Sequence, residues 1–368
     1  MSGIWPPDPG GPASHAPALA RFLASHGHDV EVVTTAGGEP EPREHPVLWV
    51  DRRRRTRHLR VALLVRASAR RADVVYATSM IRRAALGAGL ARKPLVVKLV
   101  SDEVFERATR GGRFTGTLDA FQSERGLRLD LLRRTRNAAL RRARRVFCPS
   151  AYLRDIALGW GLEPGRVSVL PNPAPDVPEL PSRDELRAEL GVGGRVLAFA
   201  GRLGPQKALG VALEAVARVP EVTLVVAGDG PERAALERRA SELDVDGRVR
   251  FLGSVSRVGV LRLFRAADAS LLPSAWENFP HTVVEALAVG CPVIATSVGG
   301  VPEIVHDSEN GLLVEPGDAD GLAAAITRFF GDDALRARLA TAAPAGVAGY
   351  TEEAVFAEIE AALREAAG

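Results

Sequence analysis

Short apolar segments alternate with amphipathic segments along the whole chain. Most of the apolar segments are continuously apolar, as strands covered on both faces are. Between them, apolar residues such as Leu209, Leu213 and Val216 recur at the helical period. This pattern predicts an α/β fold in which parallel sheets have helices on both faces. The predicted strands are Val30–Thr34, Val74–Thr78, Leu95–Val100, Val146–Pro149, Val167–Leu170, Val196–Ala200, Val222–Ala227, Val249–Leu252, Ala269–Leu272, Pro292–Thr296 and Gly311–Val314.

The alternation breaks once, at a proline-rich stretch (PNPAPDVPELP) that begins at residue 171. Prolines at this density can continue neither a helix nor a central strand. We therefore predict a linker over 171–182 that joins two Rossmann-like, doubly wound parallel-sheet domains, 1–170 and 183–346. An apolar stripe predicts a final helix within 347–368, which crosses back onto the first domain.

Composition narrows the class of protein without changing this outline. The 368 residues are 46% hydrophobic and 25% charged, as in a globular enzyme, which excludes disorder and coiled coil as the main architecture. The net charge of +3 is too small to attract the whole chain to nucleic acid. Cys148 and Cys291 are too few for a disulfide framework or a zinc site, and no signal-peptide core precedes Pro12. These features predict a cytoplasmic protein.

Two arginine-rich stretches are the strongest charge runs, Arg52–Arg55 and Arg133–Arg145. They are interpreted either as solvated surfaces or as patches that receive an anionic acceptor or the membrane surface. The second interpretation would add peripheral contact with the inner face of the membrane to a cytoplasmic location.

The segment SAWENFPHTVVEALA, residues 274–288, follows a predicted strand and contains a predicted helix start at Pro280. Free N–H groups at a helix start attract phosphate, and here they belong to His281, Thr282 and Val283.

Two carboxylates flank this helix start, Glu277 in the turn and Glu285 inside the helix. A carboxylate repels phosphate, so both are predicted to bind hydroxyl groups instead. One acid on each side of a diphosphate suits a nucleotide sugar. Glu285 is predicted to bind the ribose hydroxyls, and Glu277 is predicted to bind the hydroxyls of the sugar.

The segment FAGRLGPQKA, residues 199–208, also begins in a predicted buried strand. Loops at the carboxyl ends of parallel strands line ligand sites. Arg202 and Lys207 in this loop can flank a diphosphate and stabilise the charge of a departing nucleotide. Lysine otherwise occurs only at positions 93 and 98, which suggests that this position requires a compact ammonium group.

Together these segments resemble the retaining family 4 glycosyltransferases, which have the GT-B fold. Glu277 and Glu285 match the family's E-x7-E motif, and Gly201–Leu203 with Lys207 match its G-R-L…K element. Further likenesses are Ala227–Pro231 (AGDGP), Phe251–Gly253 (FLG), Gly290–Glu303 (GCPVIATSVGGVPE), Pro6–Gly11 (PPDPGG) and Gly27–Thr34 (GHDVEVVT).

The resemblance implies two domains that face a cleft and the retaining transfer of a hexosyl group. The donor would be a nucleotide-diphosphate sugar, and the acceptor a glycan, a lipid-linked sugar or a small metabolite. Neither a metal nor another cofactor would be required. Arg202, Lys207 and Glu277 would be catalytic. The donor-binding set would comprise Gly10, Gly11, Gly201, His281, Thr282, Val283, Glu285, Phe251 and Leu252.

The first domain departs from the family pattern after the strand Leu95–Val100. Many members have a histidine there that touches the donor sugar, whereas this chain has Ser101 and Asp102. Asp102 is therefore predicted to be the catalytic contact; the alternatives are that Ser101 takes this role or that the role is absent. Lys98 is either a phosphate or acceptor contact or a strand lysine whose ammonium reaches solvent. His15, in the first helix, is either a donor contact or an ordinary polar contact.

Two alternative functions share this scaffold: a nucleotide-sugar-binding protein without turnover, and a non-hydrolysing epimerase. The chain also departs from the family at its start, because residues 1–4 leave little room for a first strand. In a doubly wound sheet that strand is central, between the second and fourth strands. We therefore expect a few apolar residues to belong before Ser2.

Overall fold

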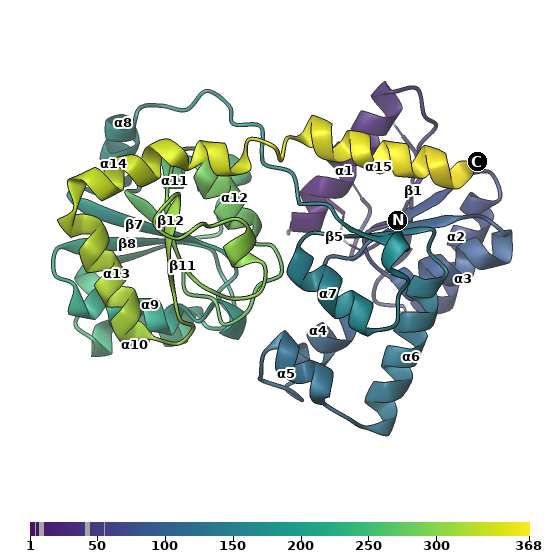
Figure 1. Ribbon diagram of the computed structural model, residues 1–368, viewed down its shortest axis with the longest axis horizontal. Helices are drawn as coiled ribbons and strands as arrows, with labels where there is room; N and C mark the ends of the chain where they lie inside the picture. Colours follow the sequence, from purple (N-terminus) through teal and green to yellow (C-terminus); the bar gives the residue numbers. More distant parts are fainter. Residues whose placement is uncertain (4, 7–10, 41–44, 55) are drawn as a thin grey trace. The chain divides into compact units, whose positions relative to one another are not determined.

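The computed structural model describes residues 1–3, 5–6, 11–40, 45–54 and 56–368, and of residues 11–14 only the backbone (Figure 1). The chain forms two compact units, one of residues 1–171 with 353–368 and one of residues 172–352. Each unit is an α/β structure with parallel strands, which confirms the predicted fold class. Residues 170–182 contain neither helix nor strand.

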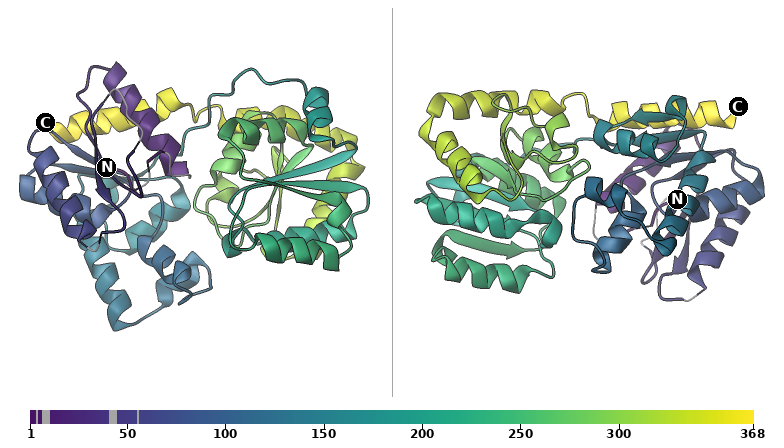
Figure 2. Two further views of the ribbon diagram at one scale, coloured as in Figure 1. Left: turned by 180° about the vertical axis from the view of Figure 1, so that it is seen from behind. Right: turned by 60° about the horizontal axis from the view of Figure 1, so that its bottom comes forward.

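The second unit has a six-stranded parallel sheet in the order β12-β11-β10-β7-β8-β9. All six strands overlap the predicted ones. Figure 2 shows this sheet between two layers of helices. The order of the strands reverses between β7 and β10, which makes this pair the topological switch point of the sheet. The strands are β7 (Arg195–Ala200), β8 (Val222–Ala227), β9 (Val249–Gly253), β10 (Ala269–Leu272), β11 (Val293–Thr296) and β12 (Gly311–Val314). The helices are α8 (Arg183–Leu190), α9 (Leu209–Arg218), α10 (Arg233–Glu242), α11 (Arg257–Ala266), α12 (His281–Ala288), α13 (Ala319–Gly331) and α14 (Asp333–Ala342).

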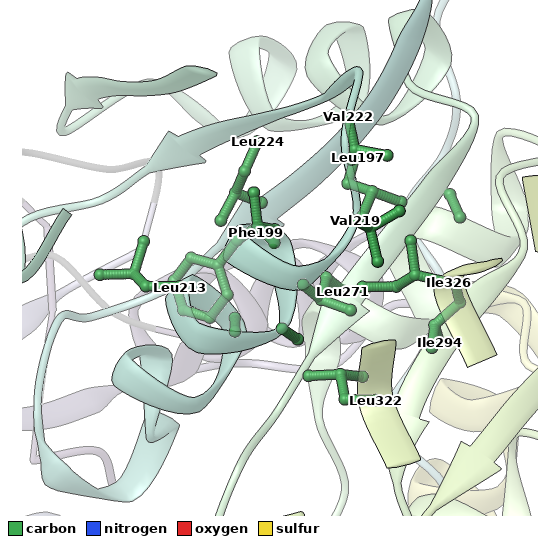
Figure 3. Close-up of a cluster of buried hydrophobic side chains, with 14 of the residues drawn as sticks. Leu197, Phe199, Leu213, Val219, Val222, Leu224, Leu271, Ile294, Leu322 and Ile326 are labelled. Carbon is green, nitrogen blue, oxygen red and sulfur yellow. The ribbon is translucent and has the colours of Figure 1, made fainter. Parts of the chain in front are cut away.

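The core of the second unit lies on both faces of this sheet, as β7 illustrates. Leu197 and Phe199 pack into one cluster with residues of α9 and α13 (Figure 3). Val196 and Ala198 face the opposite way, into a second cluster with α11 and α12. Because successive side chains of a strand point to opposite faces, a strand covered on both sides must be apolar throughout. Each large apolar side chain buried in this way contributes about 1.5–3 kcal/mol.

The first unit contains two parallel sheets, one of β1-β2 and one of β3-β4-β5-β6. The sequence analysis missed β2 and placed β1 two residues too early. The strands are β1 (Val32–Ala36), β2 (Val47–Asp51), β3 (Val75–Ala77), β4 (Leu95–Lys98), β5 (Arg145–Cys148) and β6 (Val167–Val169). The helices are α1 (Gly11–Ser25), α2 (Arg57–Ala69), α3 (Ile81–Ala91), α4 (Glu103–Arg110), α5 (Leu118–Ser123), α6 (Leu127–Arg141), α7 (Ala151–Gly159) and α15 (Glu352–Ala367).

Residues 1–3 lie between the two sheets of the first unit. The backbone N–H of Ser2 donates to the carbonyl of Val33 in β1, at 3.1 Å. On the other side, the N–H of Thr78, just after β3, donates to the carbonyl of Met1, also at 3.1 Å. This segment therefore lies between β1 and β3. The sequence analysis assigned that position to a first, central strand.

The final helix packs within the first unit. Phe356 and Ile359 of α15 lie in one buried cluster with Leu19 of α1 and with Val96 and Phe147 of the sheet. Among the described residues, no helix is both long enough and apolar enough to span a membrane.

Candidate functional site

The loops that follow β7 and β10 meet at the switch point of the second unit. The N–H of Ala275 donates to the carbonyl of Gln206 at 2.8 Å, and the Gln206 side chain donates to the carbonyl of Trp276 at 3.1 Å. The carboxyl ends of two adjacent parallel strands thus bring together the two loops that the sequence analysis singled out. Ligands bind at such positions in doubly wound sheets.

Lys207 and Glu277 form an ion pair between these loops. Lys207 Nζ lies 2.6 Å from Glu277 Oε1, and the two side chains are only 15% and 6% exposed. Ser274 donates its hydroxyl to the same oxygen at 2.7 Å, while Thr296 of β11 donates to the carbonyl of Ser274 at 2.6 Å. An ammonium group has three donors and a carboxylate has several lone pairs, so both partners keep capacity for a ligand.

This pairing differs from the sequence analysis, which gave the two groups separate tasks. Each charge is now the partner that positions the other. Ser274 is a residue that the sequence analysis missed, although its place three residues before Glu277 is the spacing of a local turn contact.

Arg202 lies in the same loop as Lys207 and is exposed to solvent. Within the described part of the chain, no carboxylate forms an ion pair with it. The exposed guanidinium is therefore available to bind an anion at the edge of the sheet, and its planar fork suits a diphosphate.

Glycines let the loop after β8 pack directly on the loop after β7. The N–H groups of Gly201 and Leu203 donate to the carbonyls of Ala227 and Asp229, both at 2.9 Å. A Cβ atom on Gly228 would lie 1.8 Å from the carbonyl oxygen of Gly201. The sequence analysis noted the AGDGP segment only as a likeness. The structure gives it the role of supporting the Arg202 loop.

The start of α12 lies one residue after the predicted helix start. Pro280 is the N-cap residue and His281 begins the helix, but the N–H of Val283 already donates to the carbonyl of Pro280 at 3.2 Å. Val283 is therefore removed from the predicted set of donors. His281 accepts a hydrogen bond from Asn172 at 3.3 Å. The buried hydroxyl of Thr282 has no hydrogen-bond partner among the described residues.

Glu285 lies within α12, and its side chain is 12% exposed. Burial raises the pKa of this carboxyl group, and Arg257 at the start of α11, 3.3 Å away, acts in the opposite direction. Arg257 is a partner that the sequence analysis did not identify.

Two other predicted donor-binding residues lie on β9, an edge strand of the sheet. Phe251 packs against the core of the second unit, and Leu252 is 40% exposed. β8 separates β9 from β7, the strand that precedes the Lys207 loop.

Asp102 in the first unit has a different task from the predicted sugar contact. Its side chain is 0% exposed, and one carboxylate oxygen accepts from the N–H of Val104 at 2.9 Å, which caps α4. The other oxygen pairs with Arg136 at 2.5 Å, and that guanidinium stacks on Trp160. The prediction is corrected because both oxygens are engaged inside the unit.

Lys98 is also buried, against both interpretations of the sequence. Its ammonium donates to the carbonyl of Leu170 and, at 3.0 Å, to that of Pro171. Burial lowers the pKa of Lys98 to about 7. The residue therefore fastens the end of β4 to the chain that leaves β6.

Most of the remaining predicted contacts of the first unit lie either just after β4 or in α1. Ser101 is half-buried just after β4. His15 in α1 makes an edge contact with Phe356, with ring centroids 5.5 Å apart. Gly11 begins α1, and Gly10 lies outside the described residues.

Two family models match the chain, each over one of the two units. The model described as Glycosyltransferase Family 4 matches residues 9–176, and the model described as Glycosyl transferases group 1 matches residues 182–345. Together they account for nearly the whole sequence, and the chain belongs to the family 4 glycosyltransferases.

Similar proteins agree with this assignment. A D-inositol 3-phosphate glycosyltransferase of Mycobacterium marinum is 40% identical over 174 residues, which is 45% of this chain and 37% of that protein's own length. The structure of HepE of Anabaena with UDP-glucose has a TM-score of 0.80 at 23% identity, and the match covers 99% of this chain and 98% of that one. Sucrose-phosphate synthase of Thermosynechococcus elongatus has a TM-score of 0.80 at 21% identity, covering 97% and 93%. These structures establish the GT-B fold.

Proposed function

We propose that this protein transfers a hexosyl group from a nucleotide-diphosphate sugar to an acceptor hydroxyl, with retention of the anomeric configuration. The observation that supports this most strongly is the Lys207–Glu277 pair at the switch point, next to an exposed Arg202. A cation pair for a diphosphate and a carboxylate for sugar hydroxyls are the groups that this reaction needs. The HepE structures contain UDP and UDP-glucose, which makes UDP-glucose the first donor to test.

The leaving diphosphate is the group on which negative charge develops. Arg202 and Lys207 bind its oxygens, and the start of α12 contributes backbone N–H groups and the free hydroxyl of Thr282. The bond between the anomeric carbon and the diphosphate breaks while the acceptor oxygen bonds to the same face of that carbon, and the proton of the acceptor hydroxyl passes to the departing diphosphate. Preorganised donors at the developing charge lower the barrier without reorganisation during the step.

The two acids of the motif divide the remaining work. Glu277 orients the hydroxyls of the sugar, and Lys207 holds its carboxylate in place. Glu285 accepts hydrogen bonds from the ribose hydroxyls of the nucleotide. Because cations and helix N–H groups meet the charge of the diphosphate, the reaction needs no divalent metal.

A donor screen tests this proposal. UDP-, GDP- and dTDP-sugars are added to the full chain, and the melting temperature and the release of nucleoside diphosphate are measured. A true donor at about a hundred times its Kd stabilises the protein by about 2.7 kcal/mol and is slowly hydrolysed. Binding without release in the presence of a broad acceptor panel would favour a silent binding protein, and no binding by any nucleotide sugar would contradict the proposal.

A further inference from the structure

Arginines gather where the strands of the first unit end. Arg52 follows β2. The next arginines come from the first turns of the helices after β2 and β3 and from the last turn of the helix after β4. These are Arg57 in α2, Arg82 and Arg83 in α3, and Arg107 in α4. Figure 1 shows α2 and α3 side by side, and a Cβ atom on Gly87 of α3 would lie 2.6 Å from Val65 of α2. The packing of α2 against α3 thus brings together the arginines at the starts of these two helices.

Backbone and side-chain contacts hold several of these arginines in place. Arg57 donates to the carbonyl of Arg52 at 2.8 Å, and Arg52 donates to the carbonyl of Thr35 in β1 at 2.9 Å. Arg83 donates to Nδ1 of His58. The side chains of Arg52, Arg57 and Arg83 are half-buried, so they form a fixed surface rather than a mobile fringe.

The placement of Arg57, Arg82 and Arg83 is unfavourable for the fold itself. A helix start has a positive partial charge, which favours acids and disfavours bases. The first turns of α2 and α3 contain no acid, and no described side chain caps either helix. Within the described ranges, Arg82 forms an ion pair with Glu103 at 2.8 Å, and the charge of Glu103 also acts on Arg83, whereas Arg57 and Arg107 form no ion pair with a carboxylate.

The titration of His58 reports the same excess of positive charge. Burial lowers its pKa, and the charges of Arg83, Arg57, Arg107 and Arg82 lower it further. All four arginines therefore act on one imidazole, which places them around a common point. A bound anion would neutralise this repulsion.

We propose that this cluster of Arg57, Arg82, Arg83, Arg107 and His58 binds a phosphate ester group, and that the acceptor supplies it. The inference rests on the glycosyltransferase function proposed above, and it adds the chemical class of the acceptor. Guanidinium forks bind phosphate oxygens in pairs, and two helix starts add N–H donors. The half-buried side chains of Arg57, Arg82 and Arg83 favour a small soluble ester over a flat membrane surface.

The test uses inorganic phosphate as the probe and the full chain saturated with UDP, so that the donor site is filled. Calorimetry compares the wild type with the double variant Arg57→Gln/Arg83→Gln. The matched control is Arg70→Gln/Arg92→Gln, which removes the same charge at the far ends of the same two helices. We expect the Kd of phosphate to rise about tenfold or more in the first variant and to stay unchanged in the control.

Thermal melting of the same samples gives a second readout. Without phosphate, Arg57→Gln/Arg83→Gln should melt at a higher temperature than the wild type, because it removes charges that repel one another. Equal phosphate binding by all three proteins, or a lower melting temperature for this variant, would overturn the inference.

Two further measurements distinguish a phosphorylated acceptor from a membrane surface, and a failure of this inference from a failure of the proposed function. UDP-glucose binding is measured in every variant. If it is intact while the cluster substitutions leave the Kd of phosphate unchanged, only this inference fails. If UDP-glucose does not bind to the wild type, the proposed function fails. Vesicles of phosphatidic acid are compared with vesicles of phosphatidylcholine. Cluster-dependent binding to the acidic vesicles without any response to inorganic phosphate would assign the cluster to a membrane and contradict a soluble acceptor.

Discussion

In both units, polar residues that the sequence analysis singled out lie at or after the ends of parallel strands. They are partly exposed in the second unit and buried in the first. In the second unit, Lys207 and Glu277 leave adjacent strands and meet in a partly exposed ion pair. In the first unit, Lys98 and Asp102 also sit at a strand end, yet both are fully buried and bonded within the fold. A polar residue at the carboxyl end of a strand is therefore a site residue only if its partners leave it open to a ligand.

The largest difference should come from breaking the buried pair of the first unit. Asp102→Ala leaves the charge of Arg136 without a partner in an enclosed place, which costs about 3–5 kcal/mol. Urea unfolding followed by circular dichroism measures the loss. Glu277→Ala is the matched substitution in the second unit and should change the stability far less. A fully stable Asp102→Ala protein with lost turnover would restore the catalytic role of this residue.

A second comparison separates the two acids of the E-x7-E motif. We expect Glu285→Ala to raise the KM for the donor about tenfold, because ribose contacts exist before and during the reaction. Glu277→Ala should instead lower kcat, because its contact orients the sugar as it reacts. Steady-state kinetics with varied donor gives both parameters, and equal changes in both parameters for both variants would remove this division of labour.

The third prediction concerns pH and the first unit alone. The folded state holds Lys98 with a pKa of about 7, below the value of 10.5 that the residue has when unfolded. Between these values the unfolded chain binds more protons, so the stability of the first unit should rise as the pH increases from about 7 to 9. Lys98→Met lacks this group, so the urea midpoint of the wild type should rise relative to that of the variant over this range. A difference that stays constant from pH 7 to 9 would mean that Lys98 does not titrate in this range.

The smallest expected effect is that of removing metal ions. Turnover after dialysis against EDTA should equal turnover before it, because in the proposed reaction Arg202 and Lys207 supply the charge that a metal would supply. Among the described residues there is no group of three or more acidic, histidine or cysteine side chains that could hold a metal ion. Activity that EDTA abolishes and magnesium restores would refute this prediction.

The sequence predicts the second unit better than the first for a physical reason. Most of its strands are apolar on both faces, and its predicted site residues lie in loops that follow strands. Topology alone therefore brings Lys207 and Glu277 into neighbouring loops. The Val283 N–H was assigned wrongly because the local turn that uses it depends on Pro280 being the N-cap rather than the first helical residue.

In the first unit, the fate of each polar residue depends on distant partners. Asp102 meets Arg136 from α6, and Lys98 meets the carbonyl of Leu170, seventy-two residues later. No local pattern indicates such pairings. The strand β2 was missed. Its residues are mostly half-exposed, unlike the buried runs by which the other strands were recognised.

The central claim is that the Lys207–Glu277 pair performs the chemistry of the second unit. The most direct measurement is the single-turnover rate of sugar transfer or hydrolysis with saturating donor, in Lys207→Ala and in Lys93→Ala as the control at a lysine of the first unit. We predict a loss of about a hundredfold in Lys207→Ala, with folding and the Lys93→Ala rate unchanged. A well-folded Lys207→Ala protein with the wild-type rate would contradict this claim.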